Sequence, residues 1–226
     1  MNPNGIITFT TDFGTRDPYA AMMKGVVLTY NRDAVMIDIT HEIPPHDIMS
    51  GAFTMLRSYR YFPEGTIHVG VVDPGVGGRR KNIVVYTGGH YFVGPDNGLF
   101  SEIIARNKKH EVRKIANKPF MLEDVSSTFH GRDVYAPCAG NLSTGTPLTE
   151  IGPLLKRYKR LDYPRVSREG STLRGAVVTI DTFGNLITNV SCKDYERFAG
   201  KKKTEILFGA ARFNRIVSRY SEVDTG

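Results

Sequence analysis

The segment TIHVGVVDPGVGGRR, residues 66–80, decides the fold because it joins a buried strand to a glycine-rich turn. Its first seven residues form an apolar, β-branched run, which is typical of a buried strand. The next eight residues hold one aspartate, one proline, three glycines and two adjacent arginines. Glycine lets a chain turn tightly and lets a ligand approach the backbone closely. We therefore expect a ligand-facing turn, beginning at Asp73, at the end of this strand.

Strand and helix patterns alternate on both sides of this segment. Short apolar runs predict strands at residues 5–10 and 34–39, and NIVVYT and HYFVGP predict a hairpin that turns at Gly88-Gly89. Helices are expected at residues 18–31, 46–62, 98–106 and 132–142. This alternation predicts an α/β fold with a mainly parallel sheet flanked by helices.

The pattern changes beyond residue 155. Residues 156–173 are rich in proline and charge, so we interpret them as a linker. The runs LRGAVVTI, NLITNV and KTEILF then predict short strands separated by turns. We therefore divide the chain into an N-terminal α/β domain (1–155), the linker, and the start of a small C-terminal β domain (174–226).

The composition is that of an ordinary globular protein. Hydrophobic residues make up 40% and charged residues 23% of the 226 residues, and no apolar run of 18 residues suggests a membrane span. The net charge of +7 is scattered, apart from the KRYKR and KKK clusters, so we expect no nucleic-acid partner. The N-terminus lacks a signal-peptide pattern, and Cys138 and Cys192 are far apart. These features favour the cytoplasm.

Two carboxylates follow strands of the expected parallel sheet. Asp12 follows the first strand and Asp73 follows the third, so both are expected on the rim where ligands of such sheets bind. The two oxygens of Asp12 suit the two hydroxyls of a ribose, although an Asx-turn would also explain this residue. Asp17 stands directly before Pro18, which predicts a helix N-cap.

Histidine is the side chain that titrates near neutral pH, and three histidines lie close to this rim in the sequence. His130 precedes a predicted helix, and His41 and His46 have comparable claims from spacing alone. A metal site could combine such residues with the aspartates, but no HxH, HExxH or DxD spacing supports it, so we expect no metal. The turn DPGVGGRR is neither a Walker motif nor GxGxxG, and an ordinary surface turn is its alternative interpretation.

The segment DTFGNLITN, residues 181–189, is the candidate site of the second domain. Asp181 and Asn185 flank Phe183, and an aromatic ring beside carboxylate and amide groups can stack on a purine or bind the charged end of an amino acid. A plain β-hairpin turn is the alternative interpretation.

Six segments, taken together and in order, resemble one family: the S-adenosylmethionine hydroxide adenosyltransferases, also called adenosine-forming S-adenosylmethionine hydrolases. They cover nearly all of residues 5–190 and are ITFTTDFGTRDPY, IDITHEIPPHDI, FPEGTIHVGVVDPGVGGRR, FVGPDNGLF, FHGRDVYAP and IDTFGNLITN. Each motif is weak alone, but six in series are specific.

The resemblance implies that water or hydroxide attacks C5′ of S-adenosyl-L-methionine and displaces methionine, giving adenosine and L-methionine without a cofactor. It implies a catalytic set of Asp73, Arg80 and His130, with Arg79 as the adjacent competitor of Arg80. Arg80 would keep Asp73 ionised, and His130 would share the proton of the water or fix its lone pair. The implied substrate-binding residues are Asp12, Asp17, Asn97, Phe129, Gly131, Asp181, Phe183 and Asn185.

The family also includes halogenases that use the same substrate. A carboxylate in the site would repel a halide, and the fluorinase carries uncharged tyrosines at the positions of Asp73 and His130, so we favour water. Gly131 resembles the chlorinase and keeps a halogenase as an alternative. A protein that binds adenosine or S-adenosylmethionine without turnover is the other alternative.

The resemblance further implies a homotrimer whose sites lie between the large domain of one subunit and the small domain of its neighbour. Members of the family continue beyond the point at which this chain stops. We therefore expect the C-terminal β domain to be truncated relative to the family, which would leave adenine binding incomplete.

Overall fold

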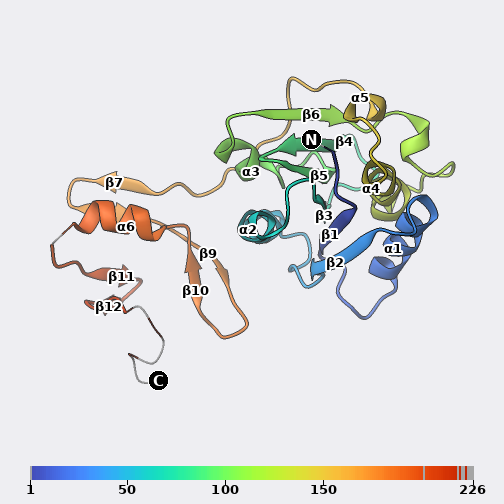
Figure 1. Ribbon diagram of the computed structural model, residues 1–226. Coiled ribbons are helices and arrows are strands. Elements are labelled where there is room, and N and C mark those ends of the chain that lie inside the picture. Colours follow the sequence, from blue (N-terminus) through green and yellow to red (C-terminus); the bar gives the residue numbers. More distant parts are fainter. Residues whose placement is uncertain (1, 201, 218, 220–221, 223–226) are drawn as a thin grey trace. The chain divides into compact units, whose positions relative to one another are not determined.

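The computed structural model describes residues 2–200, 202–217, 219 and 222 (Figure 1). The chain divides into two compact units, Met1–Tyr163 and Pro164–Gly226. The first unit is an α/β unit with a mainly parallel sheet, and the second contains small antiparallel sheets. The predicted fold class is therefore confirmed.

The sheet of the first unit has six strands in the order β2-β1-β3-β5-β4-β6. β1 is parallel to β2 and β3, β3 is parallel to β5, and β4 is antiparallel to both of its neighbours. The strands are β1 Ile6–Thr11, β2 Val35–Thr40, β3 Ile67–Val71, β4 Asn82–Thr87, β5 His90–Pro95 and β6 His110–Lys114. The hairpin is confirmed, since Gly88 and Gly89 both have positive φ between β4 and β5, as a tight turn requires. β6 was not predicted, because its sequence HEVRK is mostly polar.

Helices cover both faces of this sheet, as predicted (Figure 1). α1 and α4 pack with Ile7 and Phe9 of β1, whereas α2 and α3 pack with Phe92 and Val85. Successive residues of a strand point to opposite faces, so β4 and β5 contribute apolar side chains to both layers. The helices are α1 Tyr19–Tyr30, α2 Ile48–Ser58, α3 Ser101–Arg106, α4 Ala136–Ser143 and α5 Leu148–Ile151, and a π-helical segment, Gly131–Tyr135, leads into α4.

The prediction that Asp17 caps the first helix is wrong. The N-cap position is Pro18, with φ −78° and ψ 6°, and no side chain caps this helix. Pro18 therefore has a helix-like φ but not a helical ψ, and the helix begins one residue later than expected, at Tyr19. Asp17 is then too early to reach the first free N–H groups. By contrast, Asp47 caps α2 by accepting the Ser50 N–H at 2.9 Å.

Among its described residues, the second unit contains three strand pairs and one α-helix. β7 Ser167–Glu169 pairs with β8 Thr172–Arg174, β9 Val177–Ile180 with β10 Leu186–Thr188, and β11 Ile206–Phe208 with β12 Ala211–Phe213. β7 lies within the range that the sequence suggested as a linker. Helix α6, Cys192–Ala199, was not predicted, although Ser191 and Asp194 form a capping box at its start.

Two histidines are buried where the central strands begin. His68 Nε2 lies 3.3 Å from His90 Nδ1, and His68 Nδ1 lies 2.8 Å from the Thr8 hydroxyl. The ring of Phe92 stacks on His68, and Tyr59 packs edge-on against both histidines. Burial, helped by the proximity of His90, lowers the pKa of His68 to about 3, and burial also lowers the pKa of His90. Both rings are therefore neutral in the folded protein near pH 7.

We predict that acid destabilises this fold through His68. In the unfolded chain histidine titrates near its ordinary pKa of about 6.5, so below that pH the unfolded state binds the proton that folded His68 refuses. The free energy of unfolding should be independent of this group above about pH 6.5. It should then fall by on the order of 1.4 kcal/mol per pH unit as the pH drops towards about 3.

Urea unfolding between pH 7.5 and pH 4.5 measures this slope. His68→Gln should make the slope shallower, because glutamine does not titrate, whereas the same substitution at the exposed His110 should leave it unchanged. Equal slopes in the wild type and His68→Gln would show that another group is responsible.

Candidate active site

The loops after β1 and β3 lie side by side because these strands are parallel neighbours, with Thr11 opposite Val71. Asp12 follows β1 directly and Asp73 follows β3 after Val72, and both line one cavity of about 210 Å³. The other lining residues are Phe13, His46, Val71, Val76, Thr128, Phe129, His130 and Gly131. The cavity therefore stands at the rim where parallel sheets bind ligands, and it combines acidic, imidazole and aromatic groups.

Asp73, which lines the cavity, forms a buried ion pair with Arg80. The Asp73 side chain is 4% exposed and that of Arg80 is 10% exposed. Arg80 Nε donates to Asp73 Oδ1 at 2.8 Å, and Nη2 donates to Oδ2, so the contact is bidentate. Arg79, the alternative candidate, is exposed. The geometry thus selects Arg80 as the partner of Asp73.

The glycine-rich turn allows this pairing across only seven residues of sequence. Val76 N–H bonds to the Asp73 carbonyl at 3.2 Å, which turns the chain back towards Arg80. Gly77 has φ +73°, and a Cβ atom at this position would lie 2.1 Å from the Ser127 carbonyl oxygen. The turn therefore touches the backbone of the loop that carries His130, and only glycine permits this approach.

His130 lies on the other side of Arg80. Its Nδ1 is 2.9 Å from Arg80 Nη2 and 3.3 Å from Asn82 Oδ1. Burial and the adjacent Arg80 guanidinium lower the pKa of His130, and Asp73 and Asp133 only partly oppose this shift. His130 is therefore a neutral imidazole near pH 7.

Half-buried Asn82 and buried Tyr135, neither singled out from the sequence, complete this network. Asn82 Oδ1 accepts hydrogen bonds from Arg80 Nη1 and, at 2.8 Å, from the Tyr135 hydroxyl. The same hydroxyl is 3.4 Å from Asp73 Oδ2. Asn82 opens β4 and Tyr135 ends the π-helical segment after His130. The segment FHGRDVYAP, which contains Tyr135, was the one sequence signal for this residue. Its partner Asn82 is 53 residues away in the sequence, so the contact could not be predicted.

Asp12 is held by the backbone rather than by a cation. Its Oδ2 accepts the N–H of His46 at 2.9 Å. His46 has φ +67°, which is unusual for a residue other than glycine and is typical of functional loops. The strained turn thus aims an N–H group at Asp12 and leaves the imidazole of His46 exposed beside the cavity.

Phe13 and Phe129 supply the aromatic part of the cavity lining, and Tyr19 packs behind them. Phe13, Tyr19 and Phe129 pack edge-to-face with centroid distances of 5.3–5.8 Å. Gly131 lies against them, and a Cβ atom there would be 3.3 Å from Phe13 and 3.2 Å from Phe129. Asp133, which is fully buried, accepts the Ser126 N–H at 2.9 Å and so anchors the loop that carries Phe129 and His130.

Other predicted residues are not brought to this cavity. Asp17 is exposed and Asn97 bonds to the Val72 carbonyl at 2.8 Å, and neither is among the described residues that line the cavity. In the second unit Asp181 Oδ1 accepts the N–H groups of Phe183 and Asn185, both at 2.9 Å, so these residues form the β9–β10 turn. The Phe183 ring is 89% exposed.

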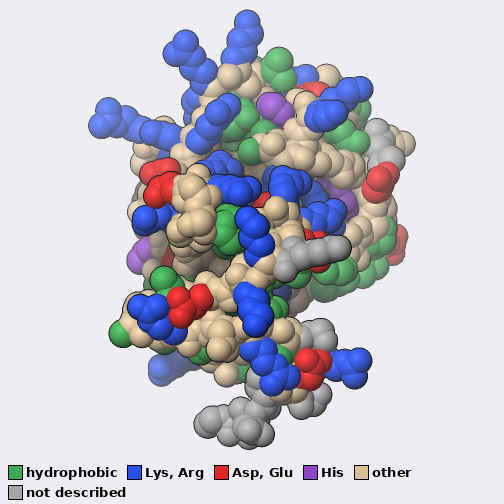
Figure 2. Space-filling model, turned by 90° about the vertical axis from the view of Figure 1, so that its left-hand side faces the viewer, with side chains coloured by type: hydrophobic (Ala, Val, Ile, Leu, Met, Phe, Trp, Pro, Cys, Tyr) green, Lys and Arg blue, Asp and Glu red, His purple; other side chains and the backbone are tan. Residues whose placement is uncertain are grey.

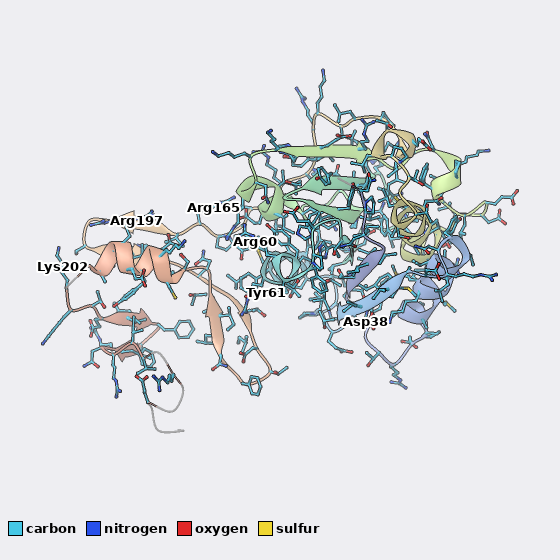
Figure 3. All side chains as sticks on the ribbon, in the orientation of Figure 1. Asp38, Arg60, Tyr61, Arg165, Arg197 and Lys202 are labelled. Carbon is cyan, nitrogen blue, oxygen red and sulfur yellow. The ribbon has the colours of Figure 1, made fainter. Side chains whose placement is uncertain are left out.

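His41, a candidate from spacing, is turned away from the cavity. It is buried, with Nδ1 2.8 Å from the Thr11 hydroxyl. Its Nε2 lies 3.0 Å from Oδ1 of Asp38 of β2, the residue that Figure 3 labels on that strand. Its carbonyl accepts the Gly14 N–H at 2.7 Å, so His41 orders the turn after Asp12. Within the described ranges, no cluster of three or more His, Cys, Asp or Glu side chains has the arrangement of a metal site.

The surface outside the cavity carries the excess basic charge. Figure 2 shows Lys and Arg side chains in several separate groups on one face, with acidic side chains among them. No described helix combines the length and the apolar character that a membrane crossing needs.

Sequence comparison relates both units to one protein family. Residues 7–152 match the family described as "SAM hydroxide adenosyltransferase N-terminal domain", and residues 175–226 match its "C-terminal domain".

Three relatives show how close the similarity is. The chain is 42% identical over 213 residues to an "(R)-S-adenosyl-L-methionine hydrolase" of Methanocaldococcus jannaschii, covering 90% of this chain and 69% of that protein. It is 38% identical to a protein of the same name from Salinispora tropica, covering 82% of this chain and 72% of that protein. A "Fluorinase" of an Actinoplanes species is more distant, at 28% identity, covering 87% of this chain and 75% of that protein.

The fold is also similar to a solved structure. The crystal structure of an uncharacterized conserved protein from Thermotoga maritima superposes with a TM-score of 0.92 at 34% sequence identity. The match covers 97% of this chain and 86% of that one.

We predict that Gly77→Ala disrupts the site more than an ordinary glycine substitution. The added Cβ atom would collide with the Ser127 carbonyl, so the turn and the His130 loop must separate. The expected loss in the free energy of unfolding is roughly 2–4 kcal/mol, measured by urea unfolding. Gly145→Ala is the matched control, since Gly145 also has positive φ (+94°) but no atom within 4 Å of the new Cβ. Equal losses in the two variants would contradict a role for the close approach.

Proposed function

Because the chain belongs to the SAM hydroxide adenosyltransferase family, we propose that it hydrolyses S-adenosyl-L-methionine to adenosine and L-methionine. The water oxygen forms a bond to C5′ while the C5′–S bond breaks, and the electron pair of that bond goes to sulfur. The sulfonium becomes a neutral thioether, so the leaving group needs no proton. The water loses one proton, which a group in the site must accept. The reaction consumes only water and substrate and needs no cofactor.

The observation that carries this proposal is the Asp73–Arg80–His130 arrangement at the cavity. Asp73 supplies carboxylate oxygens that can orient a water and take its proton, and Arg80 holds both oxygens in one plane. His130 supplies a neutral imidazole beside them. Positioning a water in line with a breaking bond is itself a large part of such catalysis.

The same arrangement argues against halide as the nucleophile. A halide needs donors and apolar walls, and an ionised carboxylate at the point of attack would repel it. The relatives named hydrolases are 34–42% identical to this chain, whereas those named fluorinases are 26–28% identical. Water is therefore the nucleophile that both the charge and the similarity favour.

The remaining binding roles follow from the chemistry of the substrate. Asp12 is proposed to accept the ribose hydroxyls, since its carboxylate lines the cavity and is oriented by the His46 N–H. Phe129 and Gly131 would line the path to C5′. Asp17 and Asp181 are proposed to bind the methionine ammonium, and Phe183 and Asn185 the adenosine, as the family resemblance implies. Asn97 would support the loop after β3 through its bond to Val72.

The size of the cavity supports an assembled site. A cavity of about 210 Å³ is smaller than the roughly 300–1,000 Å³ of typical ligand pockets, so the first unit encloses only part of the substrate. We propose a homotrimer in which the β unit of a neighbouring subunit supplies the remaining wall. The exposed Phe183 is suited to such a contact.

A cytoplasmic location and the absence of a nucleic-acid partner complete the proposal.

We predict that Asp73→Asn lowers kcat by at least about 100-fold, because the amide cannot accept the proton of water. Incubation with S-adenosyl-L-methionine, followed by chromatographic measurement of adenosine, tests this. Asp33→Asn, at an exposed aspartate after α1, is the matched control and should retain full activity. Normal adenosine release by Asp73→Asn would refute the role of Asp73. Stoichiometric bound adenosine without turnover in the wild type would instead favour a binding protein, and halogenated nucleoside would favour a halogenase.

We also predict that activity persists below the usual titration range of histidine. The pKa of His130 is lowered, so this ring stays neutral until the pH falls below about 6.5. The acid limb of kcat/KM should therefore lie below that value, and His130→Ala should both slow turnover and remove this limb. A pH–rate profile of the two proteins measures it. Identical profiles would assign His130 a purely structural role.

A further inference from the structure

Asn82 accepts a hydrogen bond from Arg80 and lies 3.3 Å from His130, and Tyr135 donates to Asn82. We propose that they are positioning residues that hold neutral His130 in the tautomer with its proton on Nε2. His130 then cannot take a proton through Nε2, and Asp73 accepts the proton of the attacking water. The role of Asp73 as proton acceptor rests on the proposed function, whereas the tautomer of His130 follows from the hydrogen bonds alone.

The first step is the orientation of the Asn82 amide. An arginine nitrogen can only donate, so the Asn82 atom that meets Arg80 Nη1 must be the oxygen. The Tyr135 hydroxyl donates to the same oxygen at 2.8 Å. Burial raises the pKa of the Tyr135 phenol well above its usual range, so this hydroxyl keeps its proton. Two donors thus occupy the two lone pairs of Asn82 Oδ1.

The second step is the state of His130 Nδ1. Arg80 Nη2 lies 2.9 Å from it and can only donate, so Nδ1 must accept and carries no proton. The alternative acceptor, Asn82 Oδ1, is farther away at 3.3 Å, and Arg80 and Tyr135 already occupy it. A neutral imidazole with an unprotonated Nδ1 carries its proton on Nε2.

The surroundings of His130 agree with a neutral ring. Burial and the adjacent Arg80 oppose its protonation, whereas the carboxylates of Asp73 and Asp133 and a hydrogen bond with the Ser126 backbone favour it. Asp12 and His46 line the same cavity. Asp73 is paired with Arg80 and Asp133 with Arg132, so each acidic neighbour is itself compensated. Arg80, which donates to Nδ1, and the occupied Asn82 Oδ1 therefore act together to keep the proton off Nδ1.

Removing the Tyr135 hydroxyl tests this arrangement. In Tyr135→Phe the ring can still pack against Arg80, whose guanidinium carbon is 6.0 Å from the ring centroid. One lone pair of Asn82 Oδ1 becomes available to a proton on His130 Nδ1. The imidazolium gains an acceptor, so the pKa of His130 should rise by about one unit. Tyr59→Phe is the matched control, since it removes another buried tyrosine hydroxyl, one that bonds to Arg60 and Asn107.

The readout is a long-range ¹H–¹⁵N correlation spectrum of protein labelled with ¹⁵N-histidine, in which His130→Gln identifies the His130 signals. The wild type should show an unprotonated Nδ1 and a protonated Nε2, and a protonated Nδ1 would overturn the proposal. The pKa from the same signals should rise in Tyr135→Phe and stay constant in Tyr59→Phe. An unchanged pKa in Tyr135→Phe would remove the positioning role.

A second variant covers the case in which Tyr135→Phe does not fold. Asn82→Asp keeps an acceptor oxygen in place and adds a negative charge beside Nδ1, so the pKa of His130 should rise by about two units. The acid limb of kcat/KM should move upward by the same amount, and an unmoved limb counts against the proposal. If the wild type fails to hydrolyse S-adenosyl-L-methionine, the proposed function fails while the spectra still decide the tautomer.

Discussion

The site depends on one guanidinium group. Arg80 donates to both oxygens of Asp73 and also reaches Asn82 and His130. A planar group with five N–H donors is the only side chain that can fix a carboxylate, an amide and an imidazole at once. Lysine could neutralise Asp73 but could not set these directions. The glycine-rich turn serves this group, since it returns the chain from Asp73 to Arg80 and lets the turn touch the His130 loop.

The charge of the site suits a cationic substrate without making the cavity strongly acidic. Asp73 is compensated by Arg80, whereas the Asp12 carboxylate accepts the His46 N–H and has no cationic partner among the described residues. In the proposed reaction, long-range attraction of the sulfonium would therefore fall mainly to Asp12. Asp73 would act at short range, through the direction of its oxygens. This division explains why two aspartates on neighbouring strands of one rim can have different roles.

Sequence alone predicted those parts of the fold and the site that depend on local pattern. The strand ends predicted where Asp12 and Asp73 lie, and Gly88-Gly89 predicted the hairpin. The sequence could not predict that Asn82 meets Tyr135, because this contact joins the start of a strand to a π-helical segment 53 residues later. No sequence signature separates that π-helical turn from an ordinary first turn of α4. The Asp17 cap failed because proline fixes φ but not ψ, and the ψ of 6° at Pro18 is not helical.

The sheet keeps histidines neutral at both of its ends, by different means. At the amino ends, burial among aromatic rings lowers the pKa of His68, and that ring is not among the residues that line the site cavity. At the carboxyl ends, burial and the adjacent Arg80 guanidinium lower the pKa of His130, which lines the cavity. The neutral state of His130 matters for the proposed reaction, because an imidazolium at the cavity would repel the sulfonium of the substrate. A cationic substrate entering this cavity opposes protonation of His130 still further. Binding and the neutral state of the ring thus reinforce each other.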